Sequence, residues 1–283
     1  MTRPSRPDQL YLFRPPYRMF VPVSVGRSLL RLPAADGSAL LWCMGSEGEE
    51  AFPSCLRNRP GGIPLIVVLP RSDEVSRPQD LFGLVDQCRP HSLLPYHDTP
   101  DPLDIRTLLA SPPPDLPATV VEYLSWRGLV LDTDLRRTLR RVLELSDQVQ
   151  TVSGLARGLY MSRRALGRRF LREGLPVPSH WLHFGRVLRV ALDLQRPGST
   201  LMAVAYEHGY PDGFSLSNQM KRLTGLRPSE AAIRLGWEWV VERWIQQEAD
   251  EGGFGAERLA RLQSRLPVGP PRTKRRYSER QPA

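Results

Sequence analysis

The chain has 283 residues, of which 41% are hydrophobic and 24% charged, and its formal net charge is +9 at pH 7. This composition is typical of a globular protein with room for two hydrophobic cores, and it excludes a disordered or collagen-like chain. The longest clean apolar run is Ile63–Leu69, which is too short to cross a bilayer, so we expect no membrane partner. The excess of positive charge favours a polyanionic partner.

The location of the charge is more informative than its total, because arginine strongly outnumbers lysine and a GC-rich genome would also produce that bias. Between Gln148 and Glu230 there are twelve Arg and Lys residues and five Asp and Glu residues, a net charge of +7 in under a third of the chain. We therefore expect this segment to carry the surface that meets the polyanion.

The three cysteines, Cys43, Cys55 and Cys88, are odd in number and widely spaced. Without a C-x-x-C pair they predict neither a disulfide framework nor a zinc site, and they favour a reducing, cytoplasmic environment. Residues 1–19 are rich in Pro and Arg and contain no apolar segment, so we expect a flexible arm rather than a signal peptide.

Residues 20–110 alternate short apolar runs with helical patterns, which predicts an α/β domain with a parallel sheet covered on both faces. The expected strands are Ala39–Cys43, Ile63–Leu69 and Ser92–Tyr96, and the expected helices are Glu49–Arg57, Gln79–Cys88 and Pro102–Leu109. This order resembles the latter part of a response-regulator receiver domain, with Pro64–Leu69 as its fourth strand and Leu93–His97 as its fifth.

The phosphorylation chemistry of a receiver is missing from this segment. The strand end that should carry the acceptor aspartate reads Leu41–Met44, and the lysine expected after the fifth strand is replaced near His97. If the domain is receiver-like it is a degenerate one, and we expect no aspartyl-phosphate switch in it. The alternative is a small α/β domain used for dimer contacts, which makes a homodimer a candidate assembly.

Residues 111–117 contain four prolines, which predicts a stiff extended linker to an all-α C-terminal part. Helices are expected at Ala118–Trp126 and Asp134–Leu145, the second capped by Thr133 or Asp134. One long helix is expected at Ser229–Gln247, with its three tryptophans covering the domain rather than forming a partner surface. Residues 118–247 thus form a helical domain, and residues 248–283 a C-terminal helix and a disordered basic tail.

Two segments of the helical domain share a layout of helix, tight turn and second helix. Each has a small alanine, Ala156 or Ala205, where the two helices must approach closely. The second helix of each unit carries an apolar pair four residues apart, Leu166 and Phe170 or Leu216 and Met220, which we expect to be buried. A helix anchored on one face and cationic on the other fits a DNA major groove.

This spacing resembles the AraC/XylS family of transcriptional regulators. The first-unit pattern A-x4-M-S-x2-x-L-x-R-x-F is matched by Ala156, Met161, Ser162, Leu166, Arg168 and Phe170, and the family's linker helix by Trp181–Gln195 with Arg186 and Ala191. The second-unit pattern is matched by Val204, Ala205, Gly209, Tyr210, Leu216, Met220, Lys221, Gly225 and Pro228. Two positions depart from the family pattern, because Phe214 replaces the usual Ser and Asn218 the usual Arg.

The resemblance covers about the C-terminal half and implies a DNA-binding domain that places two helix-turn-helix units in adjacent major grooves of double-stranded DNA. RNA polymerase is a further candidate partner. The predicted DNA-binding residues are Ser162, Arg163, Arg164, Gly167, Arg168, Arg172, Phe214, Ser215, Ser217, Asn218, Lys221 and Arg222.

Within this set we expect Arg164 and Arg168 to touch base edges, and Arg163, Arg172 and the neighbouring Arg169 to contact phosphate or stay solvated. In the second unit, Phe214 and Asn218 are expected to read an A/T-containing half-site. The alternative is that Phe214 packs inward against Tyr210 and the unit makes only phosphate contacts, through Ser215, Ser217 and Lys221.

No motif supports an enzyme, since G-x-S-x-G, a Gly-rich phosphate loop and H-E-x-x-H are all missing from the sequence. His180 and His183 could share a helix face, but no acidic or Cys partner lies near them in sequence, so neither metal nor cofactor is expected. The alternative function is the DNA-binding output module of a phosphorelay or DNA-repair protein. A repair alkyl acceptor would need an activated cysteine, which nothing around the three cysteines suggests.

Overall fold

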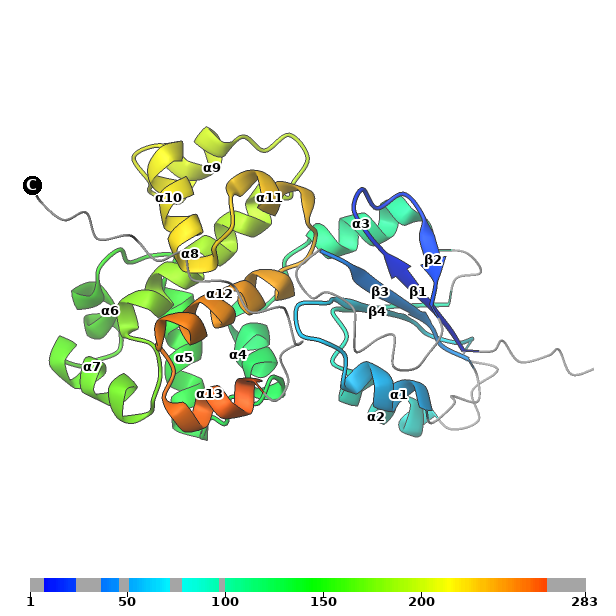
Figure 1. The fold of residues 1–283 in the computed structure, drawn as a ribbon, viewed down its shortest axis with the longest axis horizontal. Coiled ribbons are helices and arrows are strands. Elements are labelled where there is room, and N and C mark those ends of the chain that lie inside the picture. Colours follow the sequence, from blue (N-terminus) through cyan, green and yellow to red (C-terminus); the bar gives the residue numbers. More distant parts are fainter. Residues whose placement is uncertain (1–7, 24–36, 46–50, 72–77, 97–99, 264–283) are drawn as a thin grey trace, which may run out of the picture.

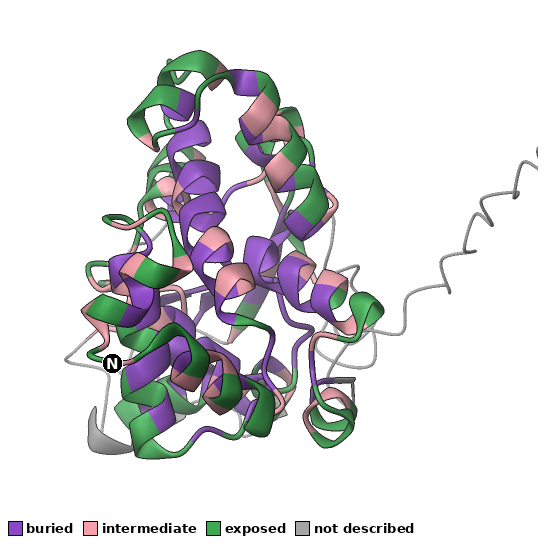
Figure 2. Ribbon diagram, turned by 90° about the vertical axis from the view of Figure 1, so that its left-hand side faces the viewer, coloured by how far each residue is buried: buried purple, intermediate pink, exposed green. Residues whose placement is uncertain are grey.

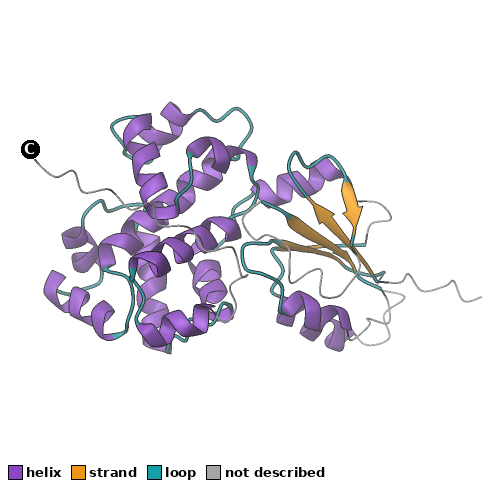
Figure 3. Cartoon of the chain, viewed as in Figure 1, coloured by secondary structure: helices purple, strands orange, loops and turns teal. Residues whose placement is uncertain are grey.

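The computed structural model describes residues 8–23, 37–45, 51–71, 78–96 and 100–263 (Figure 1). The N-terminal part is a mixed sheet with helices on both faces, and the rest of the described chain is helical (Figure 3). Its elements are β1 (Gln9–Phe13), β2 (Phe20–Pro22), β3 (Ala39–Cys43), α1 (Ala51–Arg57), β4 (Leu65–Val68), α2 (Pro78–Cys88), β5 (Ser92–Leu94) and α3 (Pro102–Ala110). The predicted α/β class and the positions of the three predicted strands are confirmed.

The sheet has the order β2-β1-β3-β4-β5. Strands β3, β4 and β5 are parallel to one another, as predicted, whereas β1 runs antiparallel to both β3 and β2. The expectation of a flexible arm over residues 1–19 is wrong for residues 9–13, which form β1, and residues 1–7 lie outside the described part. Leu10 and Leu12 are buried and alternate with exposed Gln9 and half-buried Tyr11, so the segment could pair once β3 supplied a partner. Only β3, β4 and β5 therefore resemble the all-parallel sheet of a receiver domain.

Side chains of β3 and β4 alternate between two cores, because successive residues of a strand point to opposite faces. On one face, Leu40 and Trp42 of β3 join Leu65 and Val67 of β4 beneath α1 and α2. On the other face, the remaining residues of both strands pack against Ile105 and Leu109 of α3, together with Leu235 from the C-terminal part. Both faces are covered, which explains why the strands read as continuous apolar runs.

The predicted linker at 111–117 is shorter than expected and is not an extended spacer. Helix α3 ends at Ala110, and α4 (Leu116–Trp126) already includes Pro117 in its first turn, where a missing N–H costs no helical hydrogen bond. Asp115 caps α4 by accepting a hydrogen bond from the Ala118 N–H at 2.9 Å. The chain therefore passes from the sheet domain into the helices within a few residues.

One hydrophobic core joins the helices of the C-terminal domain. These helices are α4 (Leu116–Trp126), α5 (Thr133–Leu145), α6 (Val152–Gly158), α7 (Arg163–Arg172), α8 (Pro178–Leu194), α9 (Leu201–Glu207), α10 (Gly213–Thr224), α11 (Pro228–Ile233), α12 (Glu238–Glu251) and α13 (Ala256–Gln263). Helix α5 is capped by Asp132, which precedes both predicted caps, Thr133 and Asp134. The expected basic tail, residues 264–283, lies outside the described residues.

The long helix expected over Ser229–Gln247 is wrong, because two helices, α11 and α12, occupy this segment. Between them Gly236 has a φ of +94°, and a Cβ there would lie 2.8 Å from Pro64 in the sheet domain. The break thus lets the chain approach Pro64, the residue that precedes strand β4. The tryptophans of this segment, Trp237, Trp239 and Trp244, are buried, which confirms that they cover the domain.

Buried polar contacts join the sheet domain to the helical domain, and we call this region the domain seam. Glu242 of α12 pairs with Arg127, which follows α4, and accepts a hydrogen bond from the Tyr123 hydroxyl at 2.8 Å. The Tyr123 oxygen in turn accepts from the Gly62 N–H at 2.6 Å. His91 Nδ1, at the start of β5, lies 2.7 Å from a carboxylate oxygen of Glu238. These contacts hold the two domains together as one packed unit.

Candidate nucleic-acid interface

The first helix-turn-helix unit consists of α6 and α7. Ser162 is the N-cap of α7, as predicted, because its hydroxyl accepts a hydrogen bond from the Ala165 N–H at 3.1 Å. Leu166 and Phe170 are fully buried, and so is Ala156 at the contact between the two helices. The apolar face of α7 is therefore anchored to the domain, and the opposite face is left to solvent.

Arginines crowd the outer face of α7. Arg163, Arg164, Arg168 and Arg172 are all exposed, and within the described residues no ion pair holds the first three. Arg172 lies 3.7 Å from Glu173, but its side chain remains 77% exposed to solvent. A recognition helix with these unpaired guanidinium groups can reach both phosphate oxygens and guanine edges.

Two residues of α7 depart from a uniform basic face. Arg169 is half-buried and paired with Asp134 of α5, so its charge is directed toward the domain rather than outward. Gly167, in mid-helix, has no heavy atom within 4 Å of the position where a Cβ would stand. Packing inside the protein does not require a glycine there, so the open space at Gly167 is available to a close approach of DNA.

The second unit consists of α9 and α10 and repeats this arrangement. Asp212 caps α10 by accepting a hydrogen bond from the Ser215 N–H at 2.6 Å, and this bond lowers the pKa of the carboxyl group. Leu216 and Met220 are fully buried, as predicted, beside buried Ala205 of α9. Both units thus use one capped helix with one apolar face.

The outer face of α10 is less basic than that of α7. Phe214 is 74% exposed, and Asn218, Lys221 and Arg222 are also exposed. Tyr210 is buried, with the guanidinium of Arg186 over its ring. The inward packing of Phe214 against Tyr210, the alternative raised from the sequence, is therefore wrong.

The serines of α10 are only half-buried rather than fully exposed. The Ser217 hydroxyl donates to the Gly213 carbonyl oxygen at 2.7 Å, which occupies its only proton within the helix. Ser215 gives its backbone N–H to the Asp212 cap. The Ser215 side chain also hydrogen-bonds the Asp212 carboxyl group, so the hydroxyl groups of both serines have a partner within the helix.

Helix α8 connects the two units and sets their separation. It has 17 residues, which corresponds to a length of about 25 Å at 1.5 Å per residue. Trp181 near its start makes a ring contact with Phe170 of α7, and Asp193 near its end lies 2.7 Å from His208 after α9. The units therefore occupy opposite ends of one rigid helix.

Both units lie on the side of the molecule opposite the sheet (Figure 1). Figure 2 views that side and shows exposed residues on the outer turns of the helices and buried residues on the turns between them. The sheet domain therefore does not cover the face that the two second helices present.

Two exposed residues of the first unit, Arg157 and Tyr160, lie outside the sequence-based residue set. Arg157 is exposed in the last turn of α6, and Tyr160 is fully exposed in the turn that leads to α7. The set considered the second helix of each unit and its cap, whereas a helix-turn-helix unit also meets DNA through the end of its first helix and the turn. Arg157 directly follows the buried Ala156, and its positive charge at the end of the first helix is a sequence signal that could have identified it.

His180 on α8 has an acidic neighbour that the sequence did not reveal. His180 Nδ1 lies 2.9 Å from a carboxylate oxygen of buried Glu248, 68 residues away. Desolvation raises the pKa of Glu248. Among the described residues there is no group of three or more His, Cys, Asp or Glu side chains that could hold a metal ion.

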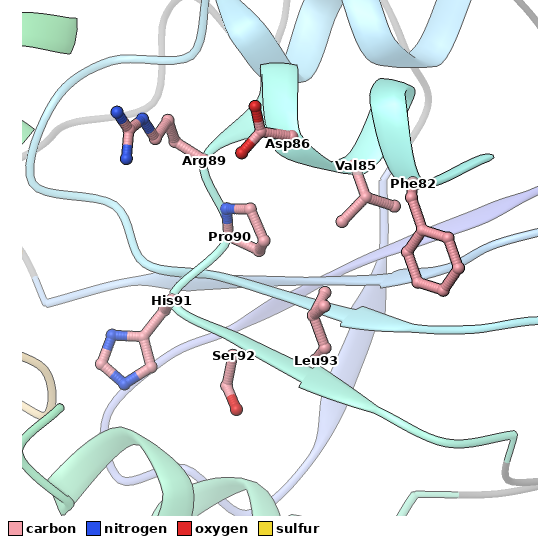
Figure 4. Close-up of a pocket in the computed structure, with 8 residues that line it drawn as sticks. All are labelled: Phe82, Val85, Asp86, Arg89, Pro90, His91, Ser92 and Leu93. Carbon is pink, nitrogen blue, oxygen red and sulfur yellow. The ribbon is translucent and has the colours of Figure 1, made fainter. Parts of the chain in front are cut away.

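The sheet domain has an open hollow of about 540 Å³ between α2 and β5. Phe82 and Val85 of α2 face Leu93 of β5, whereas His91 points away from α2 (Figure 4). Asp86 and Arg89 bring opposite charges to its rim. Nearby, burial raises the pKa of the Cys88 thiol to about 11, the reverse of what an activated nucleophile needs.

A family model described as "Helix-turn-helix domain" matches residues 155–233, which span both units and α8. No curated protein matches the chain. No helix in the described ranges is long and apolar enough to cross a membrane. The C-terminal region of this chain is a DNA-binding helix-turn-helix domain of the AraC/XylS family, a kind of domain typical of transcription regulators.

Proposed function

We propose that the chain is a sequence-specific transcriptional regulator, and not an enzyme, whose two helix-turn-helix units read adjacent major grooves on one face of the duplex. The observation that carries this proposal is the pair of capped helices, α7 and α10, each with a buried face and a free face, at opposite ends of α8. We expect α7 and α10 to enter the major groove about one helical turn of DNA apart, roughly 34 Å.

Within this proposal the two units have different roles. Arg164 and Arg168 are four residues apart on the free face of α7, so both can reach base edges, and Arg donates two hydrogen bonds to guanine. Phe214 and Asn218 are four apart on α10, where the ring can cover a thymine methyl group and the amide can pair with adenine. The expected site is composite, with a G-containing half and an A/T-containing half.

The alternative of a DNA-repair alkyl acceptor has little support. Cys88 is buried with a raised thiol pKa, and Cys43 is buried within the sheet. A role as the output module of a phosphorelay has no phosphate-accepting aspartate in the expected place, since the end of β3 carries Cys43 and Met44. A regulator without its own chemistry fits the described residues better.

The test is selection of binding sites from a pool of random duplexes, with the unmodified protein, Arg168→Ala and Asn218→Arg. Arg106→Ala is the matched control, because Arg106 is an exposed arginine of α3 in the sheet domain. The unmodified protein should enrich two half-sites centred about 10 base pairs apart. Arg168→Ala should weaken the selected site by about 1–3 kcal/mol and relax one G·C position, and Asn218→Arg should change the preferred base in the other half.

Each variant can contradict its own part of the proposal. Equal loss on selected and random DNA would assign Arg168 to the backbone. An unchanged motif with Asn218→Arg would leave the second unit as an anchor rather than a reader. Failure of the unmodified protein to enrich any motif would reject sequence-specific regulation.

A further inference from the structure

The turn of the first unit closes with a pair of hydrogen bonds that requires a left-handed residue. The Tyr160 N–H donates to the Arg157 carbonyl at 3.0 Å, and the Met161 N–H donates to the Ala156 carbonyl at 2.9 Å. This pair of bonds ends many helices. The residue whose N–H makes the first bond then lies in the left-handed region, where glycine is usual. Here that residue is Tyr160, with a φ of +54°.

The same closure occurs in the second unit with a glycine. The Gly209 N–H donates to Tyr206 at 3.0 Å and the Tyr210 N–H to Ala205 at 2.8 Å, with a φ of +70° at Gly209. The turn after α7 is built in the same way around Gly174, whose φ is +59°. The same pair of bonds also closes the turns at Gly128 after α4 and Gly252 after α12. The described part of the chain thus makes this turn five times, and only the turn that precedes α7 carries a side chain with its steric cost.

No intramolecular contact offsets that cost in the described structure. The Tyr160 side chain is 99% exposed, and none of the described hydrogen bonds involves its hydroxyl. Tyr160 lies three residues after the exposed Arg157 of α6 and two residues before the Ser162 cap of α7. If α7 enters the major groove of DNA, the turn before it lies beside the backbone phosphates at the edge of that groove, and a side chain at position 160 can reach them.

We propose that Tyr160 is a DNA-backbone contact of the first unit, with its phenol hydroxyl donating a hydrogen bond to a phosphate oxygen at the edge of the groove that α7 enters. Tyrosine hydroxyls are among the side-chain donors that contact phosphate, and such contacts fix register without reading sequence. This inference rests on the proposed function, because it needs α7 to be the groove-entering helix.

The test measures stability and DNA affinity together for Tyr160→Gly and Tyr160→Phe. Tyr160→Gly removes the strained side chain, so the melting temperature should rise by roughly 2–4 °C while affinity falls about threefold to tenfold. Tyr160→Phe should keep the melting temperature and lose affinity to a similar extent. Both losses should be equal on selected and random duplexes in fluorescence anisotropy, and the salt slope should stay unchanged because a neutral hydroxyl releases no counterion.

Tyr11→Phe is the control, since it removes a tyrosine hydroxyl from β1 that bonds to Gln9 in the sheet domain. It should leave DNA affinity unchanged. Full affinity in Tyr160→Gly would overturn the inference, and so would full affinity in Tyr160→Phe, because the contact would then not involve the hydroxyl. If Arg168→Ala weakens binding and the Tyr160 variants do not, this inference fails and the proposed function stands; if the unmodified protein shows no preference for any sequence, the proposed function itself fails.

Discussion

Replacing Glu242 by Gln should destabilise the protein more than any surface ion-pair change, because it leaves a buried guanidinium without its counter-charge. Arg127 is 1% exposed, and its Nη2 lies 3.2 Å from one Glu242 oxygen while its Nε donates to the other. Burial by itself would lower the pKa of Arg127, but the attraction of Glu242 raises it. Breaking such a pair by removing one partner costs about 3–5 kcal/mol.

The double variant Arg127→Met with Glu242→Leu separates charge from packing. It removes both charges together, and only the Tyr123 hydroxyl then loses its acceptor, so the expected cost is about 1–3 kcal/mol. The double variant should therefore be more stable than Glu242→Gln alone. Glu144→Gln is the matched control, because Glu144 pairs with Arg140 and Arg141 at the surface and should cost less than about 1 kcal/mol.

The assay is urea unfolding followed by fluorescence and circular dichroism at one pH. The unfolding midpoints from the two signals should shift together, since Tyr123 connects Glu242 to the Gly62 backbone N–H of the sheet domain. A cost below about 1 kcal/mol for Glu242→Gln would refute the argument from unpaired charge. A double variant as unstable as the single one would show instead that side-chain packing at the domain seam dominates.

Two further predictions concern His91 and Gly167. Burial would lower the pKa of His91, but the charge of Glu238 and its hydrogen bond to the ring outweigh burial and raise the pKa. Protonated His91 should therefore stabilise the folded protein fully below about pH 6.5, and this stabilisation should be lost as the pH rises through the folded-state pKa. Urea midpoints at pH 6 and pH 8 should show this decline, and His91→Gln should remove it; an unchanged decline would assign it to other groups. Gly167→Ala should stabilise the protein by about 0.5–1 kcal/mol, since a Cβ there meets open space, and should weaken DNA binding. Gly185→Ala is its control, with a Cβ 2.3 Å from the Ser146 hydroxyl oxygen and an expected cost of about 1–3 kcal/mol; unaltered DNA affinity in Gly167→Ala would show that DNA does not approach that position.

Local pattern was sufficient to predict the recognition helices and their orientation. Ser162 and the pair Leu166 and Phe170 lie within nine residues, and a helix of 3.6 residues per turn places such a pair on one side whatever the rest of the chain does. The same holds for the exposed arginines, whose direction follows from the buried pair. The parallel strands were predictable for a similar reason, because strands buried on both faces must be apolar throughout.

Contacts between distant segments decided what the sequence could not show. Strand β1 exists because β3 offers it an edge, and the helix expected over Ser229–Gln247 breaks because Gly236 must approach Pro64. Arg169, which was expected to contact phosphate or stay solvated, instead turns toward Asp134, which is 35 residues away. Such pairings depend on which surfaces the packed core brings together, and a periodic pattern carries information only about neighbours within a few turns of the chain.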